Sequence, residues 1–248
     1  INLVFSENGL QQYHNLSVNG GTEKAGVLAN ISFNDQKGNI LNYGYKRYNG
    51  RINTDLKISP KIDINFDINF SKSLRTNATQ GLDLVVQQVY RIPAVYPAIY
   101  SDGRWADGWA GRNPVAVVND GGYANVNNNY FRGSLKANYN PIQGLKLSVM
   151  YTPEYNDAYN KTFVNVFELV IDQASGSTRR IPDKNSLTQS NGRSFNETFN
   201  ALAYYSKTIK SHDFSATAGY EFMKYKYEFF SAFRDNFILP QYQVLNAG

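Results

Sequence analysis

Between residues 47 and 71, the sequence separates apolar from polar side chains by the parity of their position. Even positions are almost all apolar and include Ile52, Leu56, Ile64, Phe66, Ile68 and Phe70. Odd positions are polar and include Arg47, Arg51, Asp55, Asp63 and Asp67. Successive side chains of a β-strand point to opposite faces. The stretch therefore predicts two strands joined by a short turn near Pro60, with one apolar face and one polar face.

Three further hairpins repeat this alternation, so that the sequence predicts eight strands in all. They lie near 12–20, 25–34, 44–58, 62–74, 129–140, 145–155, 195–207 and 212–223. Short turns alternate with longer connections, of which the longest are expected at 75–128 and 156–194. Within the first of these, apolar residues from Leu82 to Val89 recur at helical spacing until Pro93 ends the pattern, which predicts a short helix.

The composition excludes several functional classes. Among the 248 residues there is no cysteine, and the two histidines lie far apart in the sequence, so we expect no disulfide scaffold, no metal site and no cofactor. The sequence offers no nucleophile with a base and an orienting group, and no glycine-rich phosphate loop, so we expect no enzyme. The net charge is +5, but lysine and arginine are scattered, which argues against nucleic-acid binding.

The apolar face of such a sheet meets either a protein core or lipid. The expected strands, of about 9 to 15 residues, are long for a soluble sheet and long enough to cross a bilayer. Aromatic residues such as Tyr48 and Tyr139 stand near strand ends, as in the aromatic girdle of a membrane barrel. We therefore predict an all-β protein, a segment of a transmembrane antiparallel barrel, whose apolar even positions face lipid. Two alternatives stay open, namely an autonomous eight-stranded outer-membrane barrel acting as an adhesin or anchor, and a soluble carbohydrate-binding β-domain.

In the membrane-barrel interpretation the polar face lines a water-filled lumen. The lumen-facing residues are then Arg47, Arg51, Asp55, Asp63, Asp67 and Arg132. The three arginines either attract an acidic ligand or pair with the three aspartates across neighbouring strands.

The long connection at 75–128 contains the candidate ligand-binding residues. They are Tyr96, Tyr100, Asp102, Arg104, Trp105, Asp107, Trp109 and Arg112. Aromatic rings stack on sugar rings or on peptide side chains, and aspartate or arginine binds hydroxyl or carboxylate groups. The structural interpretation is that Trp105 and Trp109 only fold the connection onto the barrel wall.

Several runs of residues resemble one known family. The runs are HNLSVNGGTEK (14–24), FNDQKGNI (33–40), YKRYNGRINTDLKISPKIDINFDINFS (45–71), YPAIYSDGRW (96–105) and GRNPVAVVND (111–120). In this order they resemble consecutive barrel hairpins of the SusC/RagA-type TonB-dependent outer-membrane importers. The resemblance is spread over roughly the first half of the chain.

The resemblance implies that residues 1–248 are the middle of a barrel of about 22 strands. The plug, the TonB-contacting segment, a secretion signal and the terminal strand are then expected elsewhere in a longer protein. The connections 75–128 and 156–194 would be extracellular or lumenal loops. The family implies transport rather than catalysis: a SusD-like surface lipoprotein captures an oligosaccharide or oligopeptide, and TonB acts through the plug. Outer-membrane lipid would surround the barrel.

Overall fold

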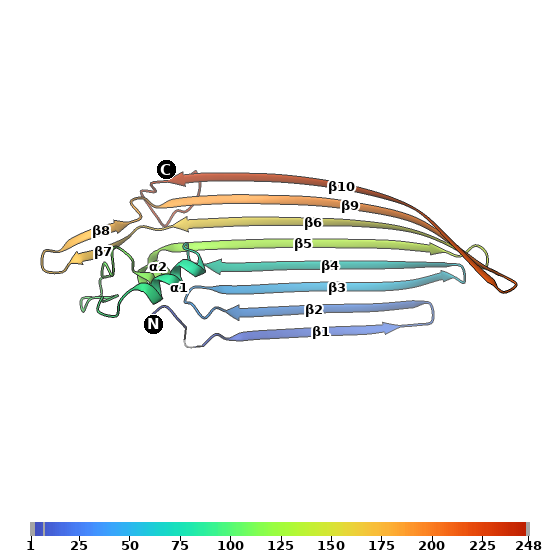
Figure 1. The fold of residues 1–248 in the computed structure, drawn as a ribbon, viewed down its shortest axis with the longest axis horizontal. Coiled ribbons are helices and arrows are strands. Elements are labelled where there is room, and N and C mark those ends of the chain that lie inside the picture. Colours follow the sequence, from blue (N-terminus) through green and yellow to red (C-terminus); the bar gives the residue numbers. More distant parts are fainter. Residues whose placement is uncertain (1–2, 7, 247–248) are drawn as a thin grey trace.

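The computed structural model describes residues 3–6 and 8–246, in which eight strands form one antiparallel sheet (Figure 1). The order across this sheet is β1, β2, β3, β4, β5, β6, β9, β10, and β7 pairs with β8 in a separate hairpin. The bounds are β1 Gln11–Gly21, β2 Ala25–Lys37, β3 Gly44–Ser59, β4 Ile62–Asn77, β5 Gly122–Tyr139, β6 Leu145–Val164, β7 Phe167–Asp172, β8 Ser177–Ile181, β9 Ser186–Ile209 and β10 His212–Asp235. The helices are α1 Leu82–Arg91 and α2 Pro114–Asp120. Neither helix of the described residues is long and apolar enough to cross a membrane.

The register of the sheet aligns the apolar positions of all eight strands. One row of directly paired residues runs Gly20, Val27, Thr54, Phe66, Leu135, Tyr151, Phe199, Phe222 and contains no charge. The row one residue further along is on the opposite face and runs Gly21, Gly26, Asp55, Asn65, Lys136, Met150, Asn200, Glu221. The alternation seen at residues 47–71 is therefore a property of the whole sheet.

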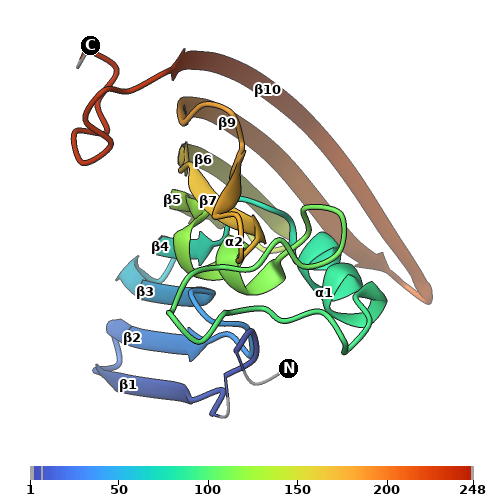
Figure 2. The same ribbon diagram turned by 90° about the vertical axis from the view of Figure 1, so that its left-hand side faces the viewer.

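The apolar face of the sheet is uncovered, and the polar face is crowded. Phe66 is 39% exposed and Leu135 is 50% exposed, whereas Asn138 and Thr152 on the other face are only 4% and 5% exposed. Side chains converge on the concave side of a curved sheet and diverge on the convex side. The polar face is thus the concave one. Figure 2 shows that the sheet curves around the helices, which lie on this concave side. A soluble sandwich would instead bury Phe66 and Leu135.

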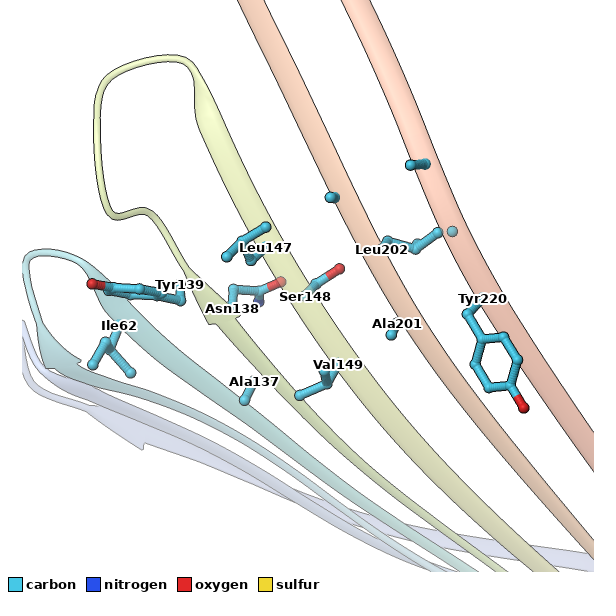
Figure 3. A pocket seen from close by; sticks show the side chains of 13 residues that line it. Ile62, Ala137, Asn138, Tyr139, Leu147, Ser148, Val149, Ala201, Leu202 and Tyr220 are labelled. Carbon is cyan, nitrogen blue, oxygen red and sulfur yellow. The ribbon is translucent and has the colours of Figure 1, made fainter.

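A shallow hollow of about 530 Å³ interrupts the apolar face near the hairpin turns (Figure 3). Ala137, Val149, Ala201 and Tyr220 lie there in one register row of four neighbouring strands. The hollow forms because alanine leaves space between the larger Leu147 and Tyr220. Most of its lining belongs to the continuous apolar face, so it is not a separate site for a polar ligand.

The strands extend further than the alternation predicted. β5 begins at Gly122 and not near 129, β6 continues to Val164, and both β9 and β10 contain 24 residues. Because of this, the segment 156–194, expected to be a loop, is mostly strand and includes the β7–β8 hairpin. Beyond the apolar band both faces carry polar residues, as at 125–129, so the sequence pattern disappears while backbone pairing continues.

The connection between β4 and β5 covers 78–121 and contains two helices. The helix predicted from the spacing of residues 82–89 is present as α1, with Val85 fully buried, but α2 was not predicted. Residues 78–121 together with 165–185, here called the loop module, lie at one end of the sheet, and both helices lie on its concave side (Figure 2). Their core also takes in residues from the N-terminal segment and the β2–β3 turn, and it contains Val4, Ile40, Val85, Val115, Ala116, Val117, Val118, Phe167 and Leu169.

Candidate functional site

Asn113 organises the loop module. Its buried side chain accepts hydrogen bonds from the backbone N–H groups of Val115 and Ala116, both at 3.1 Å, and so caps the N-terminus of α2. Its Nδ2 donates to the carbonyl oxygens of Ala98 (2.7 Å) and Ala106 (2.9 Å). One side chain thus fixes the connection 98–106 against α2. Sequence reasoning missed Asn113, although an Asn-Pro pair before an apolar run is a recognisable helix start.

Trp105 and Asp107 hold the connection to other parts of the loop module. The Trp105 indole N–H donates to Asp120 at 2.6 Å, and the Trp105 carbonyl accepts from the backbone N–H of Val170 in β7 at 2.8 Å. The Asp107 carboxylate lies 3.7 Å from Arg179 Nε and accepts from the backbone N–H of Gly111 at 3.2 Å. Both side chains therefore have structural partners, which supports the structural interpretation for Trp105.

Asp102 and Arg104 form an ion pair within an exposed turn. Arg104 Nη2 lies 2.7 Å from Asp102, whose other oxygen accepts from the Arg104 backbone N–H at 3.0 Å. The hydrogen bond from the Arg104 side chain is the main cause that lowers the pKa of Asp102, and the same contact raises the pKa of Arg104. Tyr100 closes the turn, since its carbonyl accepts from the Gly103 N–H at 3.0 Å. The charges of Asp102 and Arg104 are therefore largely paired with each other.

Tyr96 and Arg112 line a groove of about 460 Å³ between the end of α1 and the start of α2. The remaining lining is mostly apolar and includes Val89, Tyr90, Ile92, Pro93 and Val115. Trp109 stands beside the groove, with the Arg112 guanidinium 5.3 Å from the centroid of its ring. The rings of Tyr96 and Trp109 are exposed. The groove therefore combines accessible aromatic rings with a cation at its rim, an arrangement that stacks on a ring and pairs with a carboxylate or hydroxyl.

On the concave face, aspartates bond to asparagines rather than to arginines. Asp55 accepts from Asn65 at 2.5 Å, Asp63 accepts from Asn138 at 2.6 Å, and Asp67 accepts from Asn53. Each of these pairs is directly opposite in the sheet register. The expected cross-strand pairing of these aspartates with the arginines was wrong, because the register places an asparagine opposite each aspartate.

The arginines of the concave face have other partners. Arg132 Nε lies 3.2 Å from Glu154, and Arg47 Nε donates to Asn49 (2.8 Å) and Ser71 (3.2 Å). Arg51 is exposed and lies opposite Asn69. Across the described part of the chain, histidine, aspartate and glutamate nowhere form a group of three placed to hold a metal ion.

Comparison with known proteins agrees with this architecture. No family model matches the chain. A curated relative, TonB-dependent receptor P26 of Formosa agariphila, is 22% identical over 217 residues, which are 84% of this chain and 20% of the relative. The structure of the RagAB peptide transporter matches with a TM-score of 0.78 at 18% identity, over 100% of this chain and 28% of that chain. The RagAB peptide importer in the 'open-open' state gives 0.76 at 18% identity, over 96% and 26%.

The chain spans about a fifth of the curated relative and little more than a quarter of the structurally similar chains. The match to the RagAB transporter covers the whole chain, and therefore the sheet and the loop module together. The open eight-stranded sheet is thus a piece of barrel wall. The chain thus has the fold of a β-barrel segment in the RagAB structures, and its sequence is similar to that of a TonB-dependent receptor.

Proposed function

We propose that the chain forms part of the wall and one extracellular loop of an importer for oligosaccharides or oligopeptides. A SusD-like surface lipoprotein delivers the ligand, and TonB acts through the plug of the complete receptor. The observation that carries this proposal is the uncharged register row from Gly20 to Phe222, backed by a polar row on the concave side. A lipid-facing arginine or lysine at the bilayer midplane costs roughly 2–4 kcal/mol, so an uncharged face suits a barrel exterior.

The two faces then have different roles. The apolar positions Ile52, Leu56, Ile64, Phe66, Ile68 and Phe70 face lipid. The hydrogen-bonded amides, carboxylates and arginines of the concave face line the passage, where water solvates them. The groove at Tyr96 and Arg112 lies in the loop module, on the side from which a ligand would enter the lumen.

The substrate class rests on chemistry that sugars and peptides share. Accessible aromatic rings and a guanidinium group bind either kind of ligand. RagAB is described as a peptide transporter, which favours peptides for that protein. For this chain the proposal covers both classes.

The two alternatives fit the structure less well. Within the described residues β1 and β10 do not pair, so these eight strands form an open sheet and not a closed small barrel. A soluble domain would cover its apolar face, yet Leu16, Phe66 and Leu135 are exposed.

The test uses the complete receptor in its outer membrane. Uptake of fluorescently labelled oligosaccharides and oligopeptides is measured with and without TonB, and with and without an uncoupler of the proton gradient. We expect uptake of at least one probe class that needs both. Uptake that persists without TonB and without the gradient, or recovery of the receptor in the soluble fraction, would contradict the proposal.

A further inference from the structure

The hollow on the convex face lies where the sheet carries small residues between large ones (Figure 3). Two neighbouring register rows line it, namely Ala137, Val149, Ala201, Tyr220 and Tyr139, Leu147, Ala203, Ala218. The other lining residues are Ile62 and the concave row between these two, Asn138, Ser148, Leu202, Gly219. No described residue of the next concave rows lines the hollow, so it opens on the apolar side of the sheet.

The hollow does not result from the unpaired edge of the described sheet. Of its lining, only Ala218, Gly219 and Tyr220 belong to the edge strand β10. The other lining residues lie on β4, β5, β6 and β9, each of which is paired on both sides. The charged convex positions 224, 226 and 228 lie further along β10, toward the loop module. An apolar hollow of this kind leaves its walls without contacts until something fills it.

The hollow lies in the half of the apolar band that is nearer the short turns. On β4 the band is bounded by Lys61, just before Ile62, and by Lys72, the first convex charge after Phe70. At about 3.3 Å per residue and a strand tilt of about 40°, these two lysines are about 28 Å apart across the membrane, close to the thickness of a hydrocarbon layer. Ile62, beside Lys61, lines the hollow. Short turns are periplasmic in outer-membrane barrels, so the hollow faces the periplasmic leaflet.

Three lysines stand at the turns that border the hollow. They are Lys61 in the β3–β4 turn, Lys207 on the convex face of β9, and Lys210 in the β9–β10 turn. All three are exposed, and in the described part of the chain none of them forms a salt bridge. The Lys61 ammonium group donates to the carbonyl oxygen of Pro141 at 2.9 Å. This contact holds the charge at the β5–β6 turn, close to Tyr139 in the wall of the hollow.

The carboxylates of these turns lie on the other face of the sheet. Asp63 and Asp213 are concave and stand opposite Asn138 and Thr208 in the register. Asp63 accepts from Asn138 at 2.6 Å, and Asp213 accepts from the Thr208 hydroxyl at 2.7 Å. The β5–β6 turn, 140–144, contains no charged residue. The rim of the hollow is thus cationic and its interior is apolar, which complements the charge and the chains of an anionic lipid.

We propose that the hollow is a binding site for an anionic phospholipid of the periplasmic leaflet. One acyl chain fills the hollow over the alanines, and the phosphate contacts the ammonium groups at the turns through charge-assisted hydrogen bonds. Lys207 follows Ala203 by four residues, about 13 Å at about 3.3 Å per residue, so a single lipid reaches both. This inference rests on the membrane placement in the proposed function and adds a lipid partner to it.

The experiment uses the complete receptor, delipidated in detergent. Native mass spectrometry counts the lipids that stay bound after addition of phosphatidylglycerol or, separately, phosphatidylcholine. Ala203→Phe fills the hollow, and its matched control Ala29→Phe adds the same ring to the convex face of β2. Lys207→Gln removes a rim charge, and its matched control Lys24→Gln removes a charge from the β1–β2 turn. Heat-modifiable migration on gels verifies that each variant is folded.

With phosphatidylglycerol we expect wild type, Ala29→Phe and Lys24→Gln to retain the same number of lipids, and Ala203→Phe to retain one fewer. Lys207→Gln should weaken the binding of that lipid about fivefold, since a lysine near an anionic headgroup contributes about this factor. Phosphatidylcholine, which has no net charge, should bind at least about fivefold more weakly. Because Lys207 is exposed, Lys207→Gln decides the matter if Ala203→Phe does not fold.

Three results would overturn the inference: equal retention by Ala203→Phe and Ala29→Phe, equal binding by Lys207→Gln and Lys24→Gln, or no preference for phosphatidylglycerol. A receptor of doubled mass without bound lipid would also overturn it, because a second copy would then occupy the hollow. Uptake in cells separates this inference from the proposed function. Energised uptake by a receptor that fails the lipid tests removes the lipid site and leaves the importer. Normal lipid binding without energised uptake keeps the site and removes the importer.

Discussion

The barrel wall and the loop module differ in how far their apolar side chains are buried. In the loop module Val85, Ala116 and Leu169 are fully buried against one another. In the wall, Phe66 and Leu135 contact their neighbours in the sheet but remain open on the convex side. The same chain thus contains a buried apolar core and an apolar surface that stays uncovered. The residue type alone therefore does not tell whether an apolar side chain is buried. Its neighbours in the sheet and in the loop module decide this.

The largest expected effect comes from placing a charge on each side of the wall. Phe66→Arg puts a cation on the convex face and should reduce membrane-inserted receptor strongly, since a charge near the bilayer midplane costs roughly 2–4 kcal/mol. Asn65→Arg, one residue away on the concave face, should insert nearly as wild type does. The folded fraction in lipid vesicles measures both. Equal yields for the two variants would reverse the assignment of the faces.

A core truncation in the loop module should leave the wall intact. Leu169→Ala removes a fully buried side chain and should destabilise the module by about 2–5 kcal/mol. Limited proteolysis should then cut within 78–121 or 165–185 much faster than in wild type. Insertion and heat-modifiable migration should not change. If the barrel strands also lost their protection, the two regions would not be separate folding units.

Loss of the Asn113 side chain should have a smaller, local effect. Asn113→Ala removes the cap of α2 and two bonds to the connection, at a cost of about 1–2 kcal/mol for the cap. Hydrogen exchange of residues 98–118 should become faster. Asn119→Ala, which removes one bond within the same helix, is the control and should change exchange much less. Equal exchange rates in the two variants would contradict the conclusion that Asn113 fixes the connection 98–106 against α2.

The smallest expected effect is a pH dependence at Asp102. Because the contact with Arg104 lowers the pKa of Asp102, the pair stabilises its turn above the ordinary carboxyl pKa of 3.8. This stabilisation is lost as the pH falls through the lowered value. Hydrogen exchange of residues 99–106, corrected for the intrinsic rate, should be slower than in Asp102→Asn at pH 7. The difference should shrink as the pH falls below the ordinary carboxyl pKa of 3.8, and a difference that does not change with pH would contradict the role of the ion pair.

The sequence was informative wherever the two faces of a strand differ. The alternation of apolar and polar positions correctly predicted the turn at Pro60 and the pairing of β3 with β4. It did so because one face of these strands is uniformly apolar. It underestimated β5 and β6, since Asn127, Asn128 and Asn129 are polar on both faces and carry no alternation. Helical spacing located α1, which has an apolar stripe, but α2 is short and buried on all sides, so it has no stripe to detect.

At the candidate site, the sequence identified residue types but not their partners. Four of the predicted ligand-binding residues instead bond to partners within the loop module, namely Asp102, Arg104, Trp105 and Asp107. Of the predicted set, Tyr96 and Arg112 line the groove. The contact between Asp107 and Arg179 joins residues more than seventy positions apart, so no local pattern reveals it.

Accessibility of single cysteines along β4 tests the central claim most directly. The segment has no cysteine of its own, so spin labels can be placed one at a time at positions 63 to 70 in the complete receptor in lipid. We predict that labels at Ile64, Phe66, Ile68 and Phe70 collide with membrane-soluble oxygen, whereas labels at Asp63, Asn65, Asp67 and Asn69 collide with a water-soluble nickel complex. The opposite phase, or no alternation at all, would contradict the account.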